Sequence, residues 1–332
     1  MGNYINFEEK ILVAGATGMA GRSICAELKN AGYGNKKYRG KIYTPTKSEL
    51  NYLNFEETNL WFVNNKPTVV VVAAAKVGGI YANNNYSADF LLENIKIQTN
   101  LIECAWRNNV KRLLFLGSSC IYPKFSEQPI DEEELLTSAL EPTNEAYAIA
   151  KITGIKLCET LRKQYKFDAI SLMPTNLYGP GDNYKDDESH VMAALLKRFY
   201  EAVRDKKKEV VCWGTGSPYR EFMHSKDLGK AVVFALEKWN PDDKNSPRKN
   251  NGEILTYLNV GTGIDLTIKE LANKISKISG FDGKILWDQS KPDGTPKKQL
   301  NINRILKLGW SPEICINEGI EMVFKDIRED IT

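Results

Sequence analysis

The feature that most constrains this chain is a short apolar run that passes directly into a glycine-rich turn. The run is Lys10–Ala14, and the turn reads Gly15-Ala16-Thr17-Gly18-Met19-Ala20-Gly21, followed by Arg22. Apolar residues then recur at helical spacing, so the turn joins a buried strand to a helix. In such a unit, glycines permit a tight turn and let a pyrophosphate approach the backbone at the helix N-terminus. This order predicts a dinucleotide site, although an ordinary strand–helix turn can carry the same glycines.

Short apolar runs alternate with helical patterns along the rest of the chain. We predict strands at 41–44, 69–74, 112–116, 169–173 and 258–261, long helices at 87–108 and 143–165, and a later helix around 268–278. Ser87 is expected to cap the first long helix. Strands that alternate with helices form a parallel sheet with right-handed crossovers. The expected fold is α/β, a Rossmann-type doubly wound parallel sheet with a smaller C-terminal substrate-binding lobe.

The order of these elements also predicts how the chain divides. The dinucleotide-binding domain is expected over 8–175, with a segment of about 222–262 returning to it, and the lobe over 176–221 and 263–332. Ligands of such sheets bind outside the carboxyl ends of the strands, so the residues just after each strand are candidates for the site. The polar segment 240–251 is rich in proline and asparagine, and we expect a mobile surface loop there.

The end of the second predicted strand bears on which nicotinamide cofactor fits. NAD proteins usually place Asp or Glu there to bind the ribose hydroxyls. This chain has Tyr43-Thr44-Pro45-Thr46-Lys47 instead, with Arg22 just past the third glycine. Cations without a carboxylate suit a 2′-phosphate, so we expect NADP(H). Lys47 could also be an ordinary residue of a solvated loop.

Tyr147 and Lys151 lie four residues apart on the second long helix. This spacing puts the phenol and the ammonium on one face, where the cation would stabilise a phenolate and lower the pKa of the tyrosine. On its own, such a pair usually lies on a solvent-exposed helix face and has no catalytic role. It becomes a candidate for catalysis because Ser118 follows the fourth strand, at the edge where ligands bind. A serine, a tyrosine and a lysine around a nicotinamide can reduce a ketone.

Several longer blocks are more specific than the glycine pattern. They are 73–80 (AAAKVGGI), 116–124 (LGSSCIYPK), 141–151 (EPTNEAYAIAK), 173–180 (MPTNLYGP), 189–191 (SHV), 219–224 (YREFMH) and 291–296 (KPDGTP). With these blocks the chain resembles the extended short-chain dehydrogenase/reductases, and among them the GDP-L-fucose synthase family, over nearly its whole length. The resemblance implies NADPH-dependent synthesis of GDP-L-fucose from GDP-4-keto-6-deoxy-D-mannose, by 3,5-epimerisation and then 4-keto reduction.

The resemblance assigns residues to the two halves of this reaction. Cys120 would be the base and His190 the acid that invert C3 and C5, while Tyr147, Lys151 and Ser118 would serve the reduction. A cysteine thiol, with an ordinary pKa of about 8.5, needs only a modest shift to act near neutrality, and a histidine already titrates there. A buried inert thiol and a loop histidine are the alternatives.

The resemblance also implies which residues contact the two ligands. The cofactor set comprises Gly15, Thr17, Gly18, Met19, Ala20, Gly21, Arg22, Lys47, Ala74, Leu116, Gly117, Tyr147, Lys151, Pro174, Asn176, Leu177 and His190. The GDP-sugar set comprises Ser118, Ser119, Cys120, Asn176, Val191, Arg198, Trp213, Arg220 and Lys291. Guanidinium groups suit two-point binding of a pyrophosphate.

Composition narrows the classes of function. The chain has 45 Lys plus Arg against 42 Asp plus Glu and no long basic run, so we expect no nucleic-acid partner. Its most apolar run, Val69–Ala75, is far shorter than the roughly 18 residues of a membrane-spanning helix, and we expect neither a membrane segment nor a secretory signal. The six cysteines and two histidines show no metal-ligand spacing, and unpaired cysteines favour a cytoplasmic location.

The sequence also leads to two structural expectations and two alternative functions. His224 is expected to be structural, at a turn before a helix that begins near Asp227. The resemblance implies a homodimer that pairs the two long helices across a two-fold axis. The alternative functions are a nucleotide-sugar 4-epimerase or 4,6-dehydratase of the same fold and a non-catalytic NADP-sensing protein.

Overall fold

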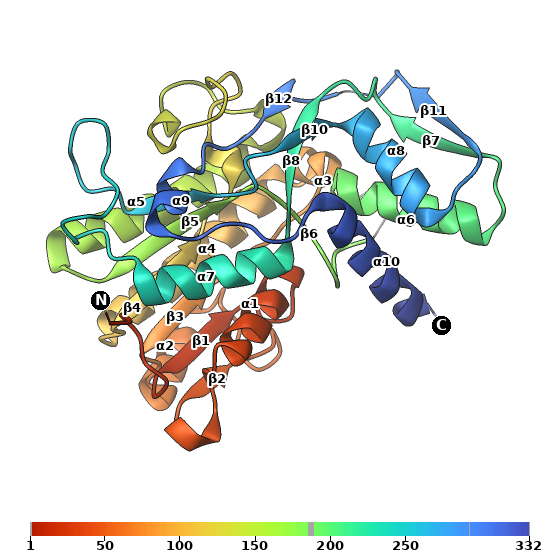
Figure 1. Cartoon of the computed structure of the whole chain (residues 1–332). Coiled ribbons are helices and arrows are strands. Elements are labelled where there is room, and N and C mark those ends of the chain that lie inside the picture. The colour runs from red at the N-terminus through yellow and green to blue at the C-terminus, as the bar shows by residue number, and fades with distance from the viewer. Residues whose placement is uncertain (1, 185–188, 292, 332) are drawn as a thin grey trace.

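Six parallel strands form the central sheet, in the order β2-β1-β3-β4-β5-β9 (Figure 1). They are β1 (Lys10–Ala14), β2 (Lys41–Tyr43), β3 (Val69–Val72), β4 (Arg112–Leu116), β5 (Ala169–Pro174) and β9 (Tyr257–Val260). This computed structural model describes residues 2–184, 189–291 and 293–331. All four valines of β3 are buried, because a central parallel strand is covered on both faces. The strand order changes direction at β1 and β3, the point at which such sheets bind ligands.

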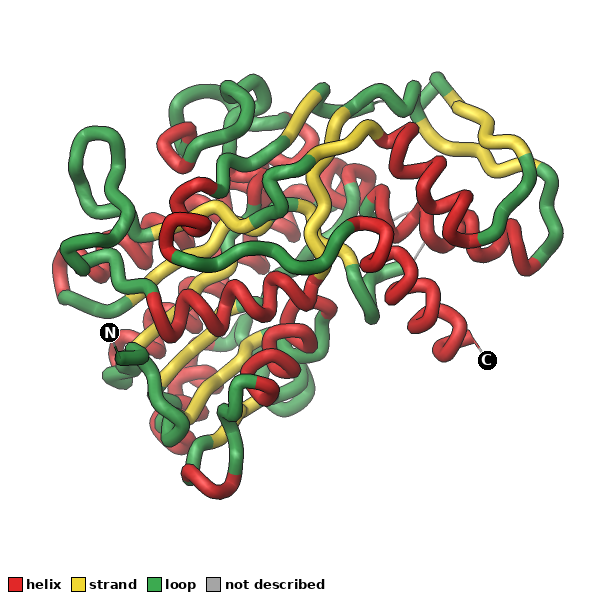
Figure 2. Tube along the Cα trace, in the orientation of Figure 1, coloured by secondary structure: helices red, strands yellow, loops and turns green. Residues whose placement is uncertain are grey.

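Helices cover both faces of the sheet, which confirms the doubly wound prediction. On one face α1 (Met19–Asn30) packs against α7 (Ser225–Lys238). On the other face α4 (Ser87–Arg107) packs against α5 (Glu145–Tyr165), and α2 (Phe55–Asn65) lies beside α4. Figure 2 shows the same layers, with the strands of the sheet between the helices.

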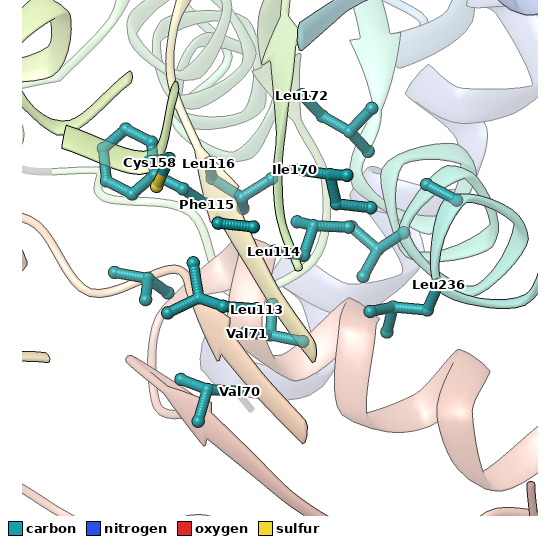
Figure 3. Close-up of a cluster of buried hydrophobic side chains, with 14 of the residues drawn as sticks. Val70, Val71, Leu113, Leu114, Phe115, Leu116, Cys158, Ile170, Leu172 and Leu236 are labelled. Carbon is teal, nitrogen blue, oxygen red and sulfur yellow. The ribbon is translucent and has the colours of Figure 1, made fainter. Parts of the chain in front are cut away.

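The core between the sheet and its helices sets where α5 lies. Leu114 of β4 lies on the side of Leu236 in α7, whereas Phe115 points toward Cys158 in α5 (Figure 3). Burying each of these large apolar side chains contributes about 1.5–3 kcal/mol. Gly154 lets α5 approach β4 closely, because a Cβ there would lie 2.5 Å from Phe115 Cζ. This close packing brings the first turns of α5 to the residues that follow β4.

A second hydrophobic cluster builds the C-terminal lobe. It includes Leu196, Leu271 and Val323, which come from α6 (Val191–Arg204), α8 (Ile268–Ser279) and α10 (Ile316–Ile331). The strands of the lobe are β6 (Asn176–Tyr178), β7 (Glu209–Trp213), β8 (Tyr219–His224), β10 (Asp265–Thr267), β11 (Lys284–Asp288) and β12 (Lys297–Lys298). Strands β6, β10 and β12 pair with β8, while β7 pairs with β11. Across the described residues, no helix is long and apolar enough to cross a membrane.

The predicted division of the chain stays a proposal, to which the structure adds one detail. The lobe cluster draws on residues from Tyr178 to Phe222 and from Ile268 to Ile327. Within the predicted lobe, however, Ile305 and Trp310 belong to the core cluster of the sheet. They lie in and just after α9 (Asn303–Leu308), so this short helix packs with the larger domain.

The first long helix begins at the predicted residue but without the predicted cap, and the second begins two residues later than predicted. The short helix α3 (Ile80–Asn85) leads through Tyr86 into α4, so Ser87 is the first helical residue and caps nothing. A 3-10 turn at Pro142–Asn144 precedes α5, which starts at Glu145. Proline suits the first position of such a turn, because its fixed φ is already helical and its missing N–H is not needed there.

The polar segment 240–251 is tied to the domain beneath it. The Trp239 indole donates to Ser246 Oγ at 3.1 Å, and Arg162 of α5 pairs with Asp242 at 2.5 Å. Arg112 of β4 donates to the carbonyl oxygen of Trp239. The segment expected to be a mobile surface loop is therefore tied to α5, and the residue just before it is tied to β4.

Candidate active site

The glycine turn forms a cradle at the N-terminus of α1. Gly15 has φ +87°, and a Cβ there would lie 2.6 Å from Ala74 N, so the residues after β3 pack directly on the turn. A Cβ at Gly18 would meet only Gly15 O, at 3.6 Å, which leaves open space before the helix. No side chain caps α1, and its first turn holds no acidic residue. Uncapped N–H groups and open space suit a pyrophosphate, so the cradle fits a dinucleotide.

A pocket of about 660 Å³ lies along α1 beside this cradle. Its lining includes Thr17, Arg22, Thr44 and Thr46, whose hydroxyl groups and cation suit a phosphorylated ribose. Lys47 is exposed and does not line the pocket, so its contact with the 2′-phosphate stays a prediction.

The end of β4 brings Ser118 against Cys120. A 3-10 turn, Ser119–Ile121, follows the strand, and Ser118 directly precedes it. Ser118 Oγ lies 2.8 Å from Cys120 Sγ and accepts from the backbone N–H of Cys120 at 3.4 Å. Both side chains are partly buried, and Ser119 is buried. The turn therefore presents a hydroxyl and a thiol together at the ligand-binding edge of the sheet.

Lys151 and Tyr147 approach this turn from α5, on the shared face that their spacing predicts. Lys151 is 3% exposed, and its Nζ donates to Leu116 O at 2.8 Å. Burial lowers the pKa of Lys151 to about 8. Burial, and after it the charge of Cys120, raises the pKa of Tyr147. The expected lowering of the pKa of Tyr147 by the lysine is therefore wrong, because desolvation outweighs a cation 5.8 Å from the ring centroid.

The other cofactor candidates lie at the carboxyl ends of the strands. Ala74 follows β3, Leu116 and Gly117 lie at the end of β4, Pro174 ends β5, and Asn176 and Leu177 open β6. Gly117 is tightly enclosed, since any Cβ there would overlap Met173 Sδ. All these positions lie at the edge where sheets of this type bind ligands.

His190 lies on the lobe, directly before α6. Its side chain is exposed, yet desolvation by the surrounding protein lowers its pKa below the usual range. Val191, the first residue of α6, is also exposed. Residues 185–188, which precede this site, and Pro292 of the 291–296 block lie outside the described residues. The pairing of His190 with Cys120 across a substrate stays a prediction.

Trp213 of β7 has two cations of the lobe close to its ring. The guanidinium carbon of Arg198 is 5.0 Å from the indole centroid, and Lys291 Nζ is 5.3 Å from it. Arg220 of β8 donates to its neighbour's carbonyl oxygen, Tyr219 O, at 2.8 Å, and burial lowers its pKa. An aromatic face flanked by cations suits a base that carries phosphates.

Glu221 holds part of the site in place but was not found from the sequence. Its carboxylate is fully buried and accepts from the backbone N–H groups of Thr262, Gly263 and Leu300. Its carbonyl oxygen accepts from the Asn176 amide at 2.9 Å. Residues far apart in the sequence meet at this carboxylate, so no local pattern could reveal it.

Lys298 was also missed. It lies in β12 and stands in register with Arg220 of β8. Its charge interacts with those of Cys120, Arg220 and Glu141, and burial lowers its pKa. A strand of two residues has no periodicity that a sequence could show.

Comparisons with known sequences show which proteins this chain is similar to. A sequence profile described as the NAD dependent epimerase/dehydratase family matches residues 11–249. The putative GDP-L-fucose synthase 2 of Arabidopsis thaliana is 47% identical over 97% of this chain and 92% of its own length. The GDP-L-fucose synthase of Escherichia coli K12 is 45% identical over 97% of this chain and 98% of its own length.

Solved structures share the fold. One is the GDP-D-glycero-L-gluco-heptose synthase of Campylobacter jejuni, determined in the presence of NADPH. It matches with a TM-score of 0.87 at 31% identity and covers 98% of this chain and 99% of that one. The extent of the profile match and the identity to full-length relatives show that the chain belongs to the NAD dependent epimerase/dehydratase family and, within it, to the GDP-L-fucose synthase group.

Proposed function

We propose that this chain makes GDP-L-fucose from GDP-4-keto-6-deoxy-D-mannose, by inverting C3 and C5 and then reducing the C4 ketone with NADPH. The observation that carries the proposal is the meeting of Ser118, Cys120, Tyr147 and Lys151 at the end of β4. Relatives that bear the name GDP-L-fucose synthase support the same activity. When bound in the cradle of α1, the nicotinamide cofactor supplies the hydride for C4.

Epimerisation needs a base and an acid on opposite faces of the sugar. The 4-keto group acidifies the C–H bonds at C3 and C5, because the enolate delocalises onto O4. Cys120, as a thiolate, takes the proton from carbon and becomes a thiol. His190 gives a proton to the other face from its imidazolium, which its lowered pKa makes a stronger acid but a minor species at neutral pH, and becomes neutral. Proton exchange with water then resets both residues for the second carbon.

Reduction needs an acid at O4. Tyr147 holds its proton at neutral pH because burial raises its pKa, so it can give that proton to O4 while C4 is reduced. The ammonium of Lys151, whose pKa is about 8, is charged at neutral pH and compensates the phenolate left behind. The Ser118 hydroxyl hydrogen-bonds the same substrate oxygen.

The GDP part is assigned to the lobe. Trp213 is assigned to the guanine, and Arg198 and Lys291, which lie 5.0 and 5.3 Å from the centroid of its ring, are assigned to the attached phosphates. Arg220 lies on the neighbouring β8 and provides a further guanidinium for the pyrophosphate. Asn176 opens β6 beside the site of the sugar, with its amide fixed by Glu221 O.

Assembly as a homodimer through α4 and α5, in the cytoplasm, is part of the proposal. The two helices pack against each other and keep apolar side chains on their surface, with Leu92 55% and Ile149 40% exposed. Covering such side chains with a second copy would remove apolar area from water. All six cysteines are free, and four of them are buried, which suits a reducing compartment.

The product of the reaction tests the proposal. The protein is incubated with GDP-4-keto-6-deoxy-D-mannose and NADPH, and NMR identifies the sugar nucleotide that forms. We expect GDP-L-fucose, with NADPH oxidised in equal amount. A 4-epimerase or a 4,6-dehydratase of this fold would leave added NADPH unconsumed, and a non-catalytic protein would return the substrate unchanged. Either outcome would overturn the proposal.

A further inference from the structure

Several stretches of the chain cross between the central sheet and the lobe, and three of them meet at Glu221. Thr175 joins β5 of the sheet to β6 of the lobe, and Thr262 and Gly263 lie between β9 and β10. Leu300 follows β12 and is buried in the core of the sheet. Because β6, β10 and β12 all pair with β8, these crossings come together around Glu221 of that strand.

The carboxylate of Glu221 is fully buried and accepts hydrogen bonds from two of these crossings. Oε1 accepts from the backbone N–H groups of Thr262 at 2.6 Å and Gly263 at 2.8 Å. Oε2 accepts from the backbone N–H of Leu300 at 2.8 Å. Hydrogen bonds to a charged acceptor are roughly twice as strong as those between neutral groups. One side chain thus holds the backbone of two crossings at fixed places beside β8.

The backbone of Glu221 holds the third crossing. Its carbonyl oxygen accepts from the side-chain amide of Asn176 at 2.9 Å and from the Thr175 hydroxyl at 3.3 Å. Gly261 makes room for the carboxylate, because a Cβ there would overlap Oε1. Three crossings that are far apart in the sequence are therefore tied to a single residue of β8.

The proposed reaction needs groups from both sides of these crossings. Cys120 and Tyr147 lie beside the sheet, near the carboxyl end of β4, whereas His190 and Arg220 lie on the lobe. A sugar held by the lobe must meet a nicotinamide held by the sheet with the reacting atoms about 3–3.5 Å apart. A misplacement of about 1 Å can cost about a hundredfold in rate, so the orientation of the lobe bears directly on the reaction.

We propose that Glu221 is a positioning residue, whose buried carboxylate fixes the lobe against the central sheet and so sets where the GDP-sugar lies relative to the nicotinamide and Cys120. The inference rests on the proposed function, because that function requires both parts of the chain to act on one sugar. Glu221 acts through the strand that also carries Arg220, the residue directly before it. Without the carboxylate, the crossings loosen while the sheet and the lobe keep their own cores.

Glu221→Gln breaks part of this arrangement. A glutamine has a single carbonyl oxygen, which can accept from Thr262 and Gly263 or from Leu300 but not from both sides, since its NH2 group only donates. Hydrogen exchange of the full chain, followed by mass spectrometry, measures the result without substrate. We expect exchange about tenfold faster in the peptides that contain 261–264 or 299–302, and wild-type exchange within β1, β4, α6 and α8.

Asp227→Asn is the matched control. Asp227 is also buried, but its bonds from the backbone N–H groups of Glu313 and Ile314 both go to Oδ2, so one asparagine carbonyl can accept both. We expect wild-type exchange at 261–264 and 299–302 in this variant. Should Glu221→Gln fail to fold by circular dichroism, Gly261→Ala, which displaces the same carboxylate, carries the same test. An equal rise throughout the chain, or no rise at either crossing, would overturn the inference.

Kinetics tests whether the orientation of the lobe serves the reaction. In Glu221→Gln, NADPH alone and GDP alone, titrated by calorimetry, are expected to bind with wild-type affinity, because each is assigned to one part of the chain. At saturating substrate and NADPH, kcat for NADPH oxidation is expected to fall about tenfold or more, with little change in KM. A wild-type kcat, or a loss that appears only as weaker binding of GDP or NADPH, would overturn the inference.

The failure of the proposed function would look different. It appears as the absence of GDP-L-fucose from the NMR assay of the wild-type protein, whereas hydrogen exchange at the crossings is measured without substrate and tests the role of the carboxylate on its own.

Discussion

Ser118 Oγ lies 2.8 Å from Cys120 Sγ, so the hydroxyl assigned to the reduction also touches the base of the epimerisation. A hydroxyl carries one proton, and the same oxygen accepts from the Cys120 N–H at 3.4 Å. That proton can point to the sulfur or to O4 of the substrate, but not to both at once. The two half-reactions therefore share one donor, which serves the thiolate first and O4 once the sulfur is protonated.

Ser118→Ala is expected to slow both half-reactions by about tenfold or more, because each loses a hydrogen bond to a developing negative charge. Deuterium uptake at C3 and C5 and the rate of NADPH oxidation are measured on the same preparation, with NADPH affinity as the control. If only NADPH oxidation slows, the contact between Ser118 and Cys120 has no part in the epimerisation.

Lys151→Met is expected to abolish reduction and yet stabilise the fold at neutral pH. Burial lowers the pKa of Lys151 from 10.5 to about 8, so the native state disfavours the charged form. That cost to folding is complete below about pH 8 and vanishes as the pH rises toward 10.5. Methionine has no charge to bury and so does not have this cost. The loss of the hydrogen bond to Leu116 O offsets part of the gain, so we expect the free energy of unfolding at pH 7 to rise by about 1–2 kcal/mol.

Urea unfolding of wild type and Lys151→Met at pH 7 and pH 10 measures this difference. The stabilisation is expected to shrink at pH 10, where the wild-type lysine folds largely uncharged. A difference that is equal at both pH values would show that the burial of charge is not its cause.

Gly154→Ala tests the packing that places α5. The added Cβ would lie 2.5 Å from Phe115 Cζ, so α5 must move away from β4. We expect a loss of about 1–3 kcal/mol in stability and a lower rate of reduction, because Tyr147 and Lys151 move with the helix. The neighbouring Thr153→Ala, at a half-buried position of the same helix, is the control and should leave both unchanged. An unaltered melting temperature in Gly154→Ala would contradict this account of the packing.

Ile149→Arg tests the proposed dimer. A charge among the exposed apolar residues of α4 and α5 opposes their burial against a second copy, so the variant is expected to be monomeric. Light scattering over a range of concentrations gives the mass, and Lys163→Glu, toward the other end of α5, serves as a charge-changing control. A wild type that is monomeric at all concentrations would contradict the dimer.

Periodicity predicted the sheet well because its strands are short, apolar and separated by helices. The strand predicted at 112–116 is β4, and the predicted strand at 69–74 ends earlier, at Val72. The structural role of His224 is also confirmed, since its Nδ1 accepts from the Lys226 N–H at the start of α7. Local spacing carries this information, because strand, turn and cap each involve residues close in sequence.

Contacts between distant parts of the chain could not be predicted from the sequence. Glu221 is satisfied by backbone N–H groups of Thr262 and Leu300, and Lys298 lines a small cavity with Tyr122 only after the lobe has folded onto the sheet. The pKa of Tyr147 was predicted in the wrong direction for a related reason. Spacing shows which cation is near, but the burial that decides the pKa depends on the whole fold.

Deuterium uptake tests most directly the central claim that Cys120 serves the epimerisation and Tyr147 the reduction. Wild-type protein, substrate and NADPH in D₂O are expected to yield GDP-L-fucose with deuterium at C3 and C5. Cys120→Ser is expected to fold and bind NADPH but to incorporate no deuterium, whereas Tyr147→Phe should exchange both positions and oxidise NADPH about a hundredfold more slowly. Exchange at the native rate in Cys120→Ser, or unimpaired NADPH oxidation in Tyr147→Phe, would contradict the account.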